Sequence, residues 1–265
     1  MITQKYKVID GIKTFNHKNY NDDYNPDNLI ELYKQEEKHF WFITRKEFIL
    51  KKISKVISID KKIIEIGAGT GNITKYLIKH GYKNISVGEM HLDGLKYAKL
   101  YGIKDCYQFN LLNIPFEDEF DTIMMFDVLE HLENDSLALK NIKQALKPKG
   151  IIALTVPAHM WLWSKNDTTA CHKRRYNKRE LKSILLKEGF DTLTINYFFI
   201  FITPLLLLRR FINRDTPQNI EKTKEIKINK YINQALLHIS RFENRFNKFI
   251  PNFFGGSILV IARKK

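Results

Sequence analysis

The chain has 265 residues, of which 44% are hydrophobic and 12% aromatic, enough to form one full α/β domain with a buried core. This composition argues against an intrinsically disordered chain. The 44 Lys and Arg residues outnumber the 29 Asp and Glu residues and give a formal net charge of +15. Such a charge indicates an anionic partner, which includes nucleic acid, an acidic membrane and a negatively charged substrate, although a lysine-rich and isoleucine-rich composition also arises without any binding role.

The two cysteines, Cys106 and Cys171, lie far apart and outside any CxxC or Cys/His pattern. We therefore expect no disulfide framework and no metal site. The first ten residues lack the apolar segment of a secretory signal. The longest apolar run, 195–208, is interrupted by Asn196 and Pro204 and is shorter than the roughly 20 residues of a spanning helix. A cytoplasmic location is expected.

The segment in front of Pro26 is polar and rich in Asn, Asp and Tyr, which predicts an irregular arm. Pro26 and Asp27 are typical of a helix start. Apolar residues then recur at helical spacing between Leu29 and Ile57. We expect one long helix or two shorter ones here, so that residues 1–58 form an N-terminal helical arm.

From residue 61 onward, short apolar segments alternate with amphipathic helical segments. The expected strands cover residues 62–66, 84–89, 105–110, 120–126, 150–156, 190–197 and 257–262, and the expected helices cover 72–80, 92–100, 136–146 and 178–187. This alternation predicts a doubly wound α/β fold with a mostly parallel, seven-stranded sheet. Residues 198–254 hold more helix than a connection needs and are expected to form a helical cap inserted into a domain of residues 59–265.

A glycine-rich turn joins the first of these strands to the first helix. It contains Gly67, Gly69 and Gly71, and glycine lets the backbone approach a ligand closely because it has no Cβ and accepts positive φ. Glu89 ends the next strand, where a carboxylate can accept hydrogen bonds from both hydroxyls of a ribose. A nucleotide-like ligand is therefore predicted, and the alternative is a tight turn with an unrelated surface glutamate.

The turn disfavours two common nucleotides. Asn72 stands where the dinucleotide fingerprint has its last glycine, and the chain has no phosphate-binding G-x-x-x-x-G-K-[ST] segment. Glu65 precedes the turn and would repel a pyrophosphate, but it would favour a cationic ligand. NAD and ATP are therefore weaker candidates.

Four motifs follow one another along the chain. They are Glu65-x-Gly67-x-Gly69-x-Gly71, the isolated Glu89, the strand that ends in Asp127-x-x-Glu130-His131, and Pro148-x-Gly150 in front of the next strand. In this order and spacing the chain resembles class I S-adenosylmethionine-dependent methyltransferases. The resemblance implies S-adenosylmethionine as the cofactor and a Rossmann-like seven-stranded sheet whose last strand is antiparallel.

Two flanking segments resemble a narrower group of bacterial stand-alone methyltransferases. They are the helical pattern between Glu37 and Arg45 and the pattern between Asp167 and Tyr176. Members of this group act on small metabolites, sugars and lipid-linked glycans, and some resemble enzymes that esterify the carboxyl terminus of peptides. Under this resemblance the arm of residues 1–58 covers the cofactor site.

The resemblance implies cofactor contacts from the helical arm, the glycine turn and the ends of the following strands. The expected cofactor-binding residues are Arg45, Glu65, Gly67, Ala68, Gly69, Gly71, Glu89, Met90, Asn110, Phe126 and Asp127. Asn110 stands where the family usually has Asp, and its side-chain oxygen can still accept a hydrogen bond from the adenine amino group. Arg45 either meets the cofactor carboxylate or is an ordinary surface charge.

Methyl transfer is a displacement in which the enzyme mainly aligns the acceptor. An ionised carboxylate needs no base, whereas an alcohol does. The expected catalytic residues are His131, His172 and Tyr176, and the expected acceptor-binding residues are His159, Trp163, Arg174 and Arg175. Arginine side chains suit carboxylates. The alternatives are that His131 only holds a loop and that Arg174 or Arg175 forms a salt bridge with Asp167.

The apolar run that begins at Phe198 allows three interpretations. It is a cap helix lining the acceptor pocket, a peripheral membrane contact through residues 198–214, or a dimer contact. Residues 203–265 hold 13 basic and 4 acidic side chains, which favours a local anionic surface or substrate.

The predicted function is O-methylation of an anionic small-molecule or peptide acceptor, such as a carboxylate. The alternative enzyme is a sugar or lipid-linked glycan methyltransferase acting on O or N, with His131 as the base. A nucleic-acid-binding module is the alternative outside enzymes. No RRM, KH or helix-turn-helix pattern supports it, so no nucleic-acid partner is expected.

Overall fold

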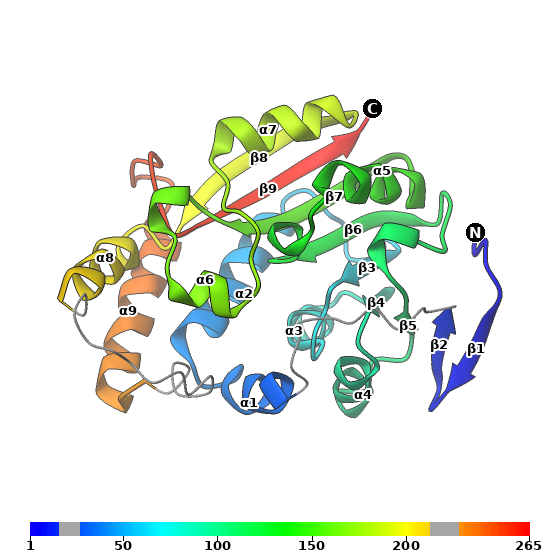
Figure 1. The fold of residues 1–265 in the computed structure, drawn as a ribbon, viewed down its shortest axis with the longest axis horizontal. Helices are drawn as coiled ribbons and strands as arrows, with labels where there is room; N and C mark the ends of the chain where they lie inside the picture. The colour runs from blue at the N-terminus through cyan, green and yellow to red at the C-terminus, as the bar shows by residue number, and fades with distance from the viewer. Residues whose placement is uncertain (16–26, 213–227) are drawn as a thin grey trace.

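The computed structural model describes residues 1–15, 27–212 and 228–265, which fold around one mixed β-sheet (Figure 1). The strands are β1 (Tyr6–Ile9), β2 (Ile12–Phe15), β3 (Ile63–Ile66), β4 (Ile85–Glu89), β5 (Cys106–Gln108), β6 (Phe120–Phe126), β7 (Leu146–Pro157), β8 (Phe190–Phe198) and β9 (Ser257–Lys264). The α-helices are α1 (Asp27–Gln35), α2 (Phe40–Ile53), α3 (Asn72–Lys79), α4 (Leu92–Leu100), α5 (Asp135–Ala145), α6 (Lys165–Thr169), α7 (Lys178–Lys187), α8 (Ile202–Ile212) and α9 (Lys230–Phe246). Three short 3-10 helices are η1 (Leu111–Asn113), η2 (Leu129–His131) and η3 (Met160–Leu162).

All seven predicted strands are present, and the Rossmann-like fold is confirmed. The sheet order is β1-β2-β5-β4-β3-β6-β7-β9-β8. Strands β5, β4, β3, β6 and β7 run parallel, and the final strand β9 lies antiparallel between β7 and β8. Because β3 pairs with β4 on one side and β6 on the other, the chain reverses its winding direction there, and ligands bind at such a point outside the carboxyl ends of the strands.

The prediction of an irregular arm is wrong for the first described residues. Residues 6–15 form a β-hairpin, and its second strand adds to the sheet edge parallel to β5. The turn consists of Asp10 and Gly11, which both have positive φ, as a tight two-residue hairpin turn requires. The described sheet therefore has nine strands, two more than predicted. The predicted arm of residues 16–25 and Pro26 lie outside the described residues.

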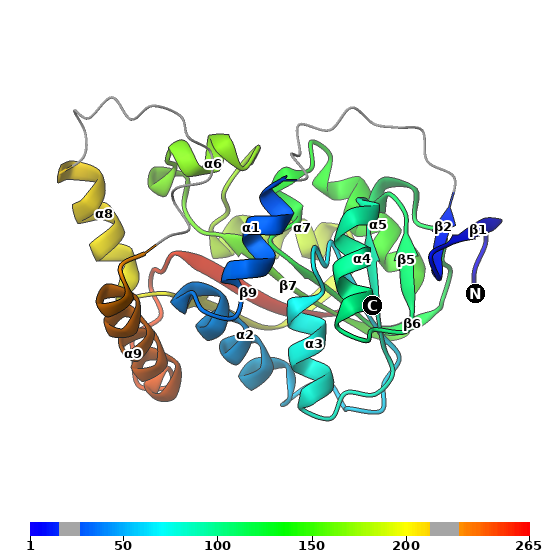
Figure 2. The same cartoon turned by 90° about the horizontal axis from the view of Figure 1, so that it is seen from below.

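Helices cover both faces of the sheet, as the two views in Figure 1 and Figure 2 show. Alternate residues of β6 point to opposite faces: Ile123 and Met125 pack with α5 and α7, whereas Met124 and Phe126 pack with α2 and α3. Because the side chains of a strand alternate, burial on both faces requires the continuous apolar sequence that β6 has.

The inserted segment forms α8 and α9, and α9 packs against α2 at the carboxyl edge of the sheet (Figure 1). The Asn233 amide donates to the Lys38 carbonyl, and its side-chain oxygen accepts from the Phe40 backbone N–H. Arg241 pairs with Glu47 at 2.6 Å. These contacts hold the start and the middle of α2, whose other face lines the functional cavity.

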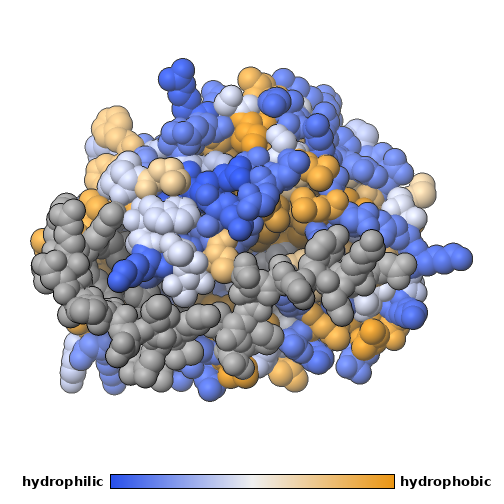
Figure 3. Space-filling view, in the orientation of Figure 1, coloured by the Kyte–Doolittle hydropathy of each residue, from blue (hydrophilic) through white to orange (hydrophobic). Residues whose placement is uncertain are grey.

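The molecular surface seen in the orientation of Figure 1 is largely hydrophilic. In Figure 3, hydrophobic residues form separate groups among hydrophilic ones. Among the described residues, no helix combines the length and apolar character needed to cross a bilayer.

Candidate cofactor and acceptor site

A cavity of about 550 Å³ opens at the carboxyl ends of β3, β4 and β6. Its walls come from α1, α2, the glycine turn, the ends of β4 and β6, η1, and the segment of residues 169–173. The predicted cofactor residues that line it are Arg45, Glu65, Gly67, Ala68, Gly69, Glu89, Met90, Asn110, Phe126 and Asp127. The fold thus brings ten of the eleven expected cofactor residues to one cavity.

The three positions of the turn require glycine for different structural reasons. Gly67 and Gly69 have φ values of +70° and +54° and line the cavity. A Cβ on Gly67 would lie 2.3 Å from Val128 Cγ2. Gly71, at φ +80°, is the N-cap of α3 and does not line the cavity. A Cβ there would lie 2.8 Å from Ile103 Cδ1 and 3.0 Å from Ala98 Cβ. Gly71 therefore allows the turn to pack closely against α4, and its cofactor role stays a prediction.

Glu89 is fixed by backbone amides on both of its carboxylate oxygens. The Gly69 N–H donates to Oε2 at 2.9 Å, and the N–H groups of Met90 and His91 donate to Oε1 at 2.7 and 3.2 Å. Each carboxylate oxygen can accept more than one hydrogen bond. The carboxylate is thus held rigidly at the cavity with acceptor capacity left for a ligand.

Two further carboxyl groups at the cavity have raised pKa values. Glu65 is fully buried and accepts a hydrogen bond of 2.6 Å from the Thr74 hydroxyl. Burial raises its pKa to about 7. Glu36, which the sequence did not single out, accepts from the Thr70 hydroxyl, and burial also raises its pKa to about 7. A bound cation would favour the ionised form of both groups.

Arg45 lies on the buried side of α2 and is not an ordinary surface charge. Its Nη2 lies 2.6 Å from Asp127 Oδ2, and its guanidinium stacks 4.8 Å from the centre of the Trp41 ring. The Thr155 hydroxyl donates to the other oxygen of Asp127 at 2.9 Å. Asp127 itself has a φ of +55°, a conformation that non-glycine residues adopt at a cost. The pair joins α2 to the end of β6.

Asn110 and Phe126 both line the cavity. The Asn110 side-chain oxygen accepts from the Leu112 N–H at 2.8 Å and caps η1. An amide oxygen has two lone pairs, so this cap is compatible with the predicted hydrogen bond to a ligand amino group.

Of the three predicted catalytic residues, His131 lines the cavity and His172 lies beside it. Their rings are 4.7 Å apart and nearly perpendicular. Two effects lower the pKa of His131 to about 4. The larger is the burial of its ring among protein atoms, and the second is the positive charge that the neighbouring His172 can carry. Tyr176 lies outside the cavity lining, and its hydroxyl donates to Asp135 at 3.0 Å. Burial raises the pKa of Tyr176, and its catalytic role stays a prediction.

The predicted acceptor residues are not part of the cavity lining. Arg174 pairs with Asp135 at 3.1 Å, and Arg175 binds Asp167 through two hydrogen bonds of 2.7 and 2.9 Å. These carboxylates hold the two guanidinium groups within the loop, so the salt-bridge alternative applies.

The aromatic members of the predicted acceptor site also build the loop. The His159 ring stacks between Trp161 and Tyr197. Trp163 ends η3, with its N–H bonded to the Met160 carbonyl. The same segment instead brings residues 169–171 and Lys173 to the cavity.

The family model for the methyltransferase domain matches residues 33–195. The chain belongs to this family. The predicted membership of the class I S-adenosylmethionine-dependent methyltransferases is confirmed. This methyltransferase is 29% identical over 117 residues to the ubiquinone biosynthesis O-methyltransferase of Rickettsia canadensis, which corresponds to 42% of this chain and 50% of the relative. The chain thus spans about half the length of such curated relatives.

Solved structures share the fold of this methyltransferase. The phosphoethanolamine N-methyltransferase 2 of Haemonchus contortus in complex with S-adenosyl-L-methionine aligns with a TM-score of 0.61 at 14% identity, over 92% of this chain and 58% of that one. A SAM-dependent methyltransferase from Archaeoglobus fulgidus aligns with a TM-score of 0.56 at 17% identity, over 91% of this chain and 100% of that one. At these identities the likeness concerns the fold.

The residues at the cavity fit S-adenosylmethionine. The rigid Glu89 carboxylate suits a ribose diol. Glu65 and Glu36, whose raised pKa values a bound cation would lower, suit the positive charges of the methionine part. Glu36 and Phe42 also line the cavity but were not among the predicted cofactor residues. Their positions at the cavity follow only from how the N-terminal helices pack.

Proposed function

We propose that this methyltransferase methylates an oxygen atom of an anionic acceptor, such as a carboxylate of a peptide or a metabolite. The observation that carries the proposal is the position of the cationic Lys173, which lines the cavity together with the predicted base His131, and the lowered pKa of His131 agrees with it. A base with a pKa far below neutral is a poor acceptor for the proton of an alcohol. A carboxylate is already ionised near neutral pH and needs no base.

Each residue would then contribute by binding and orientation. When bound, S-adenosylmethionine supplies a methyl group on a positively charged sulfur. Glu89 would hold the ribose, Asn110 the adenine, and Glu65 with Glu36 the cationic methionine end. Arg45, held by Asp127, would offer its remaining N–H groups to the methionine carboxylate.

The acceptor would enter beside His131. Lys173 lies at the cavity there and pairs with Glu133 at 3.1 Å, with 38% of the lysine side chain exposed. An exposed ion pair is weak and exchanges readily, so Lys173 can turn to an anionic acceptor. Relatives named as O-methyltransferases favour oxygen as the methylated atom.

The decisive experiment compares acceptor chemistries. We expect purified protein with S-adenosylmethionine to methylate carboxylates, giving esters that mild base hydrolyses to methanol. A base-stable ether or N-methyl product would contradict the proposal and favour the sugar or glycan alternative. In that case His131→Ala should abolish turnover, because the sugar or glycan alternative uses His131 as its base.

A membrane surface is the proposed site where the protein meets its acceptor. Phe201, Leu205 and Leu208 of the segment 198–214 are exposed, and the Phe201 ring lies 6.5 Å from the exposed Phe242 of α9. Together with the exposed basic side chains of Arg245 and Lys248 near the end of α9, such a patch suits an anionic lipid surface. The proposed location is cytoplasmic, at the inner face of a membrane.

Vesicle co-sedimentation tests the membrane contact. We expect binding to vesicles with anionic lipid and loss of binding in the variant Leu208→Ser/Phe242→Ser. Leu100→Ser is the matched control, because Leu100 is 72% exposed on α4, outside this patch. Equal binding of all three proteins, or dimerisation without vesicle binding, would contradict the membrane contact.

A further inference from the structure

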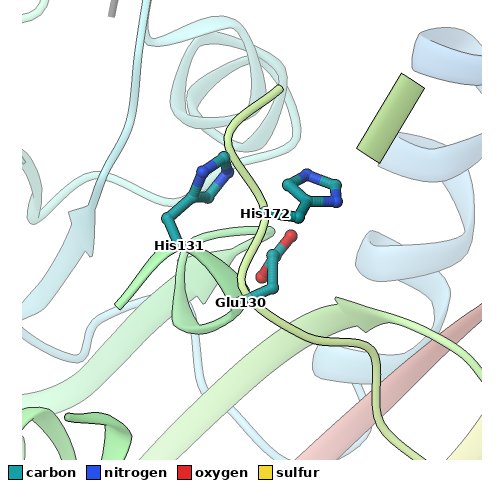
Figure 4. Close-up of side chains that lie close together, drawn as sticks. All are labelled: Glu130, His131 and His172. Atoms are coloured by element: carbon teal, nitrogen blue, oxygen red, sulfur yellow. The ribbon is translucent and has the colours of Figure 1, made fainter. Parts of the chain in front are cut away.

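Three side chains with metal-binding groups meet beside the acceptor end of the cavity (Figure 4). One donor atom from each of Glu130, His131 and His172 lies within 4.8 Å of the other two. Glu130 and His131 belong to η2, directly after β6, and His172 follows α6. The Lys173 N–H donates to the Glu130 carbonyl at 2.8 Å, which holds the two segments together.

The Glu130 carboxyl group is completely buried. Its side chain is 0% exposed, and neither of its oxygens has a hydrogen-bond partner among the described residues. A buried carboxyl group without a partner is costly. A positively charged partner at this position would remove that cost.

Both histidines are oriented by oxygen atoms behind them. Nδ1 of His172 lies 2.9 Å from Asp167 Oδ1. Because a carboxylate only accepts hydrogen bonds, Nδ1 carries the hydrogen and Nε2 keeps its lone pair. Asp167 is in turn fixed by Arg175. The ring of His131 hydrogen-bonds the backbone of Ala170. Metal-binding histidines are typically held in this way by a carboxylate or a backbone carbonyl.

We propose that Glu130, His131 and His172 bind a divalent transition-metal ion of the Zn²⁺ type. Two imidazoles and one carboxylate are a common protein donor set for catalytic zinc, which keeps a further position open. Mg²⁺ and Ca²⁺ prefer sites built from oxygen atoms alone. The binding of the ion does not depend on the identity of the methyl acceptor.

The position of the ion suggests what it does for the acceptor. His131 lines the cavity and is partly exposed to solvent, so the open position would face the space that an acceptor enters. A metal ion there would bind an anionic oxygen and orient it, a task that Arg174 and Arg175 do not perform because they are held by Asp135 and Asp167. This role rests on the proposed function.

The test measures metal content and affinity of the full chain. After removal of metal with a chelator and dialysis, we expect one equivalent of Zn²⁺ to bind, and Co²⁺ to give the visible absorption of a site with nitrogen ligands. Glu130→Gln, His131→Ala and His172→Ala should each lower the Zn²⁺ affinity at least about tenfold, and Asp167→Asn should lower it by about 10- to 100-fold through loss of orientation. His80→Ala, at the C-cap of α3, is the control and should bind like the wild type.

Two measurements keep this inference separate from the methyltransferase activity. S-adenosylmethionine binding, measured by calorimetry on the metal-free protein, checks that each variant is folded and that the cofactor site is intact. Absence of stoichiometric Zn²⁺ binding in a protein that binds S-adenosylmethionine would overturn the metal site alone. Wild-type Zn²⁺ affinity in the His131→Ala/His172→Ala variant would overturn it as well. Zn²⁺ binding without methyl transfer to any carboxylate would overturn the proposed acceptor and leave the metal site in place.

Discussion

Arg45 of α2 lies 2.6 Å from Asp127, the residue that follows β6, and so connects the N-terminal helices to the centre of the sheet. The arginine side chain is 10% exposed and the aspartate side chain 21%. Two charges with so little solvent around them depend on each other, because removal of one leaves the other without compensation. The contact therefore contributes to both the stability of the fold and the shape of the cofactor cavity.

Arg45→Met should lower the free energy of unfolding by about 3 kcal/mol, since it leaves Asp127 without its partner. Urea unfolding measures the loss. Arg241→Met is the matched control: this residue forms an ion pair with Glu47 on the surface, and its side chain is 49% exposed. It should cost no more than about 1 kcal/mol. Equal losses for the two variants would contradict a larger contribution of the Arg45–Asp127 pair to stability.

Glu89→Gln should weaken S-adenosylmethionine binding by about 10-fold or more, because a hydrogen bond to a charged group contributes roughly 1.5–3 kcal/mol. The amide cannot accept hydrogen bonds on both of its ends, so it also disturbs the N–H groups of Gly69 and Met90. Calorimetry gives the affinity. Glu117→Gln, an exposed glutamate outside the cavity lining, should leave it unchanged. An unchanged affinity in Glu89→Gln would contradict the ribose-binding role.

Affinity for S-adenosylmethionine should rise with pH through about 7, where Glu65 and Glu36 lose their protons. Only the ionised carboxylates attract the cationic ligand, so binding is weaker below this range and levels off above it. Glu65→Gln and Glu36→Gln should each remove part of the pH dependence. Binding curves over roughly pH 6 to 8 test this. A flat wild-type profile would rule out both groups as contacts of the cationic end.

The same two carboxyl groups predict the pH dependence of stability without ligand. Their pKa values are higher in the folded chain than in the unfolded one, so the folded state binds more protons. Their contribution to stability is fully present below about pH 4.3 and is lost as the pH rises through about 7. The midpoint of thermal unfolding in the ligand-free double variant Glu36→Gln/Glu65→Gln should therefore fall less between these pH values than that of the wild type.

Gly67→Ala should be more destabilising than Gly69→Ala. Both residues have positive φ, which costs an alanine roughly 1–2 kcal/mol. At Gly67 the new Cβ would also lie 2.3 Å from Val128 Cγ2, whereas at Gly69 nothing lies within 4 Å. Thermal unfolding of the two variants tests the order. The double variant Gly67→Ala/Val128→Ala should recover part of the loss, and failure to recover would show that the clash with Val128 is not its cause.

Local patterns were sufficient for most of the sheet, and the predicted cofactor residues, which followed from the family resemblance, mostly line one cavity. Apolar strands alternating with amphipathic helices predicted β3 to β9, because burial on two faces requires that pattern. The hairpin of residues 6–15 was missed although its Asp10-Gly11 turn is a recognised local signal. Short polar strands at a sheet edge bury little apolar surface, so their periodicity is weak.

The acceptor half depended on contacts between distant segments. Arg174 and Arg175 looked suited to an anionic acceptor, but Asp135 and Asp167 bind them, and sequence spacing does not reveal which charges pair. In the same way, the spacing of these residues in the sequence does not predict that His172 lies beside Glu130 and His131.

The sequence by itself determined the fold class, through apolar strands that alternate with amphipathic helices, and it determined the family and the cofactor through motifs whose order and spacing resemble class I S-adenosylmethionine-dependent methyltransferases. Only the tertiary structure decided which charged side chains face the cavity. Electrostatic pairing depends on distances of a few ångströms between residues far apart in the chain, such as Arg45 and Asp127, and packing sets those distances.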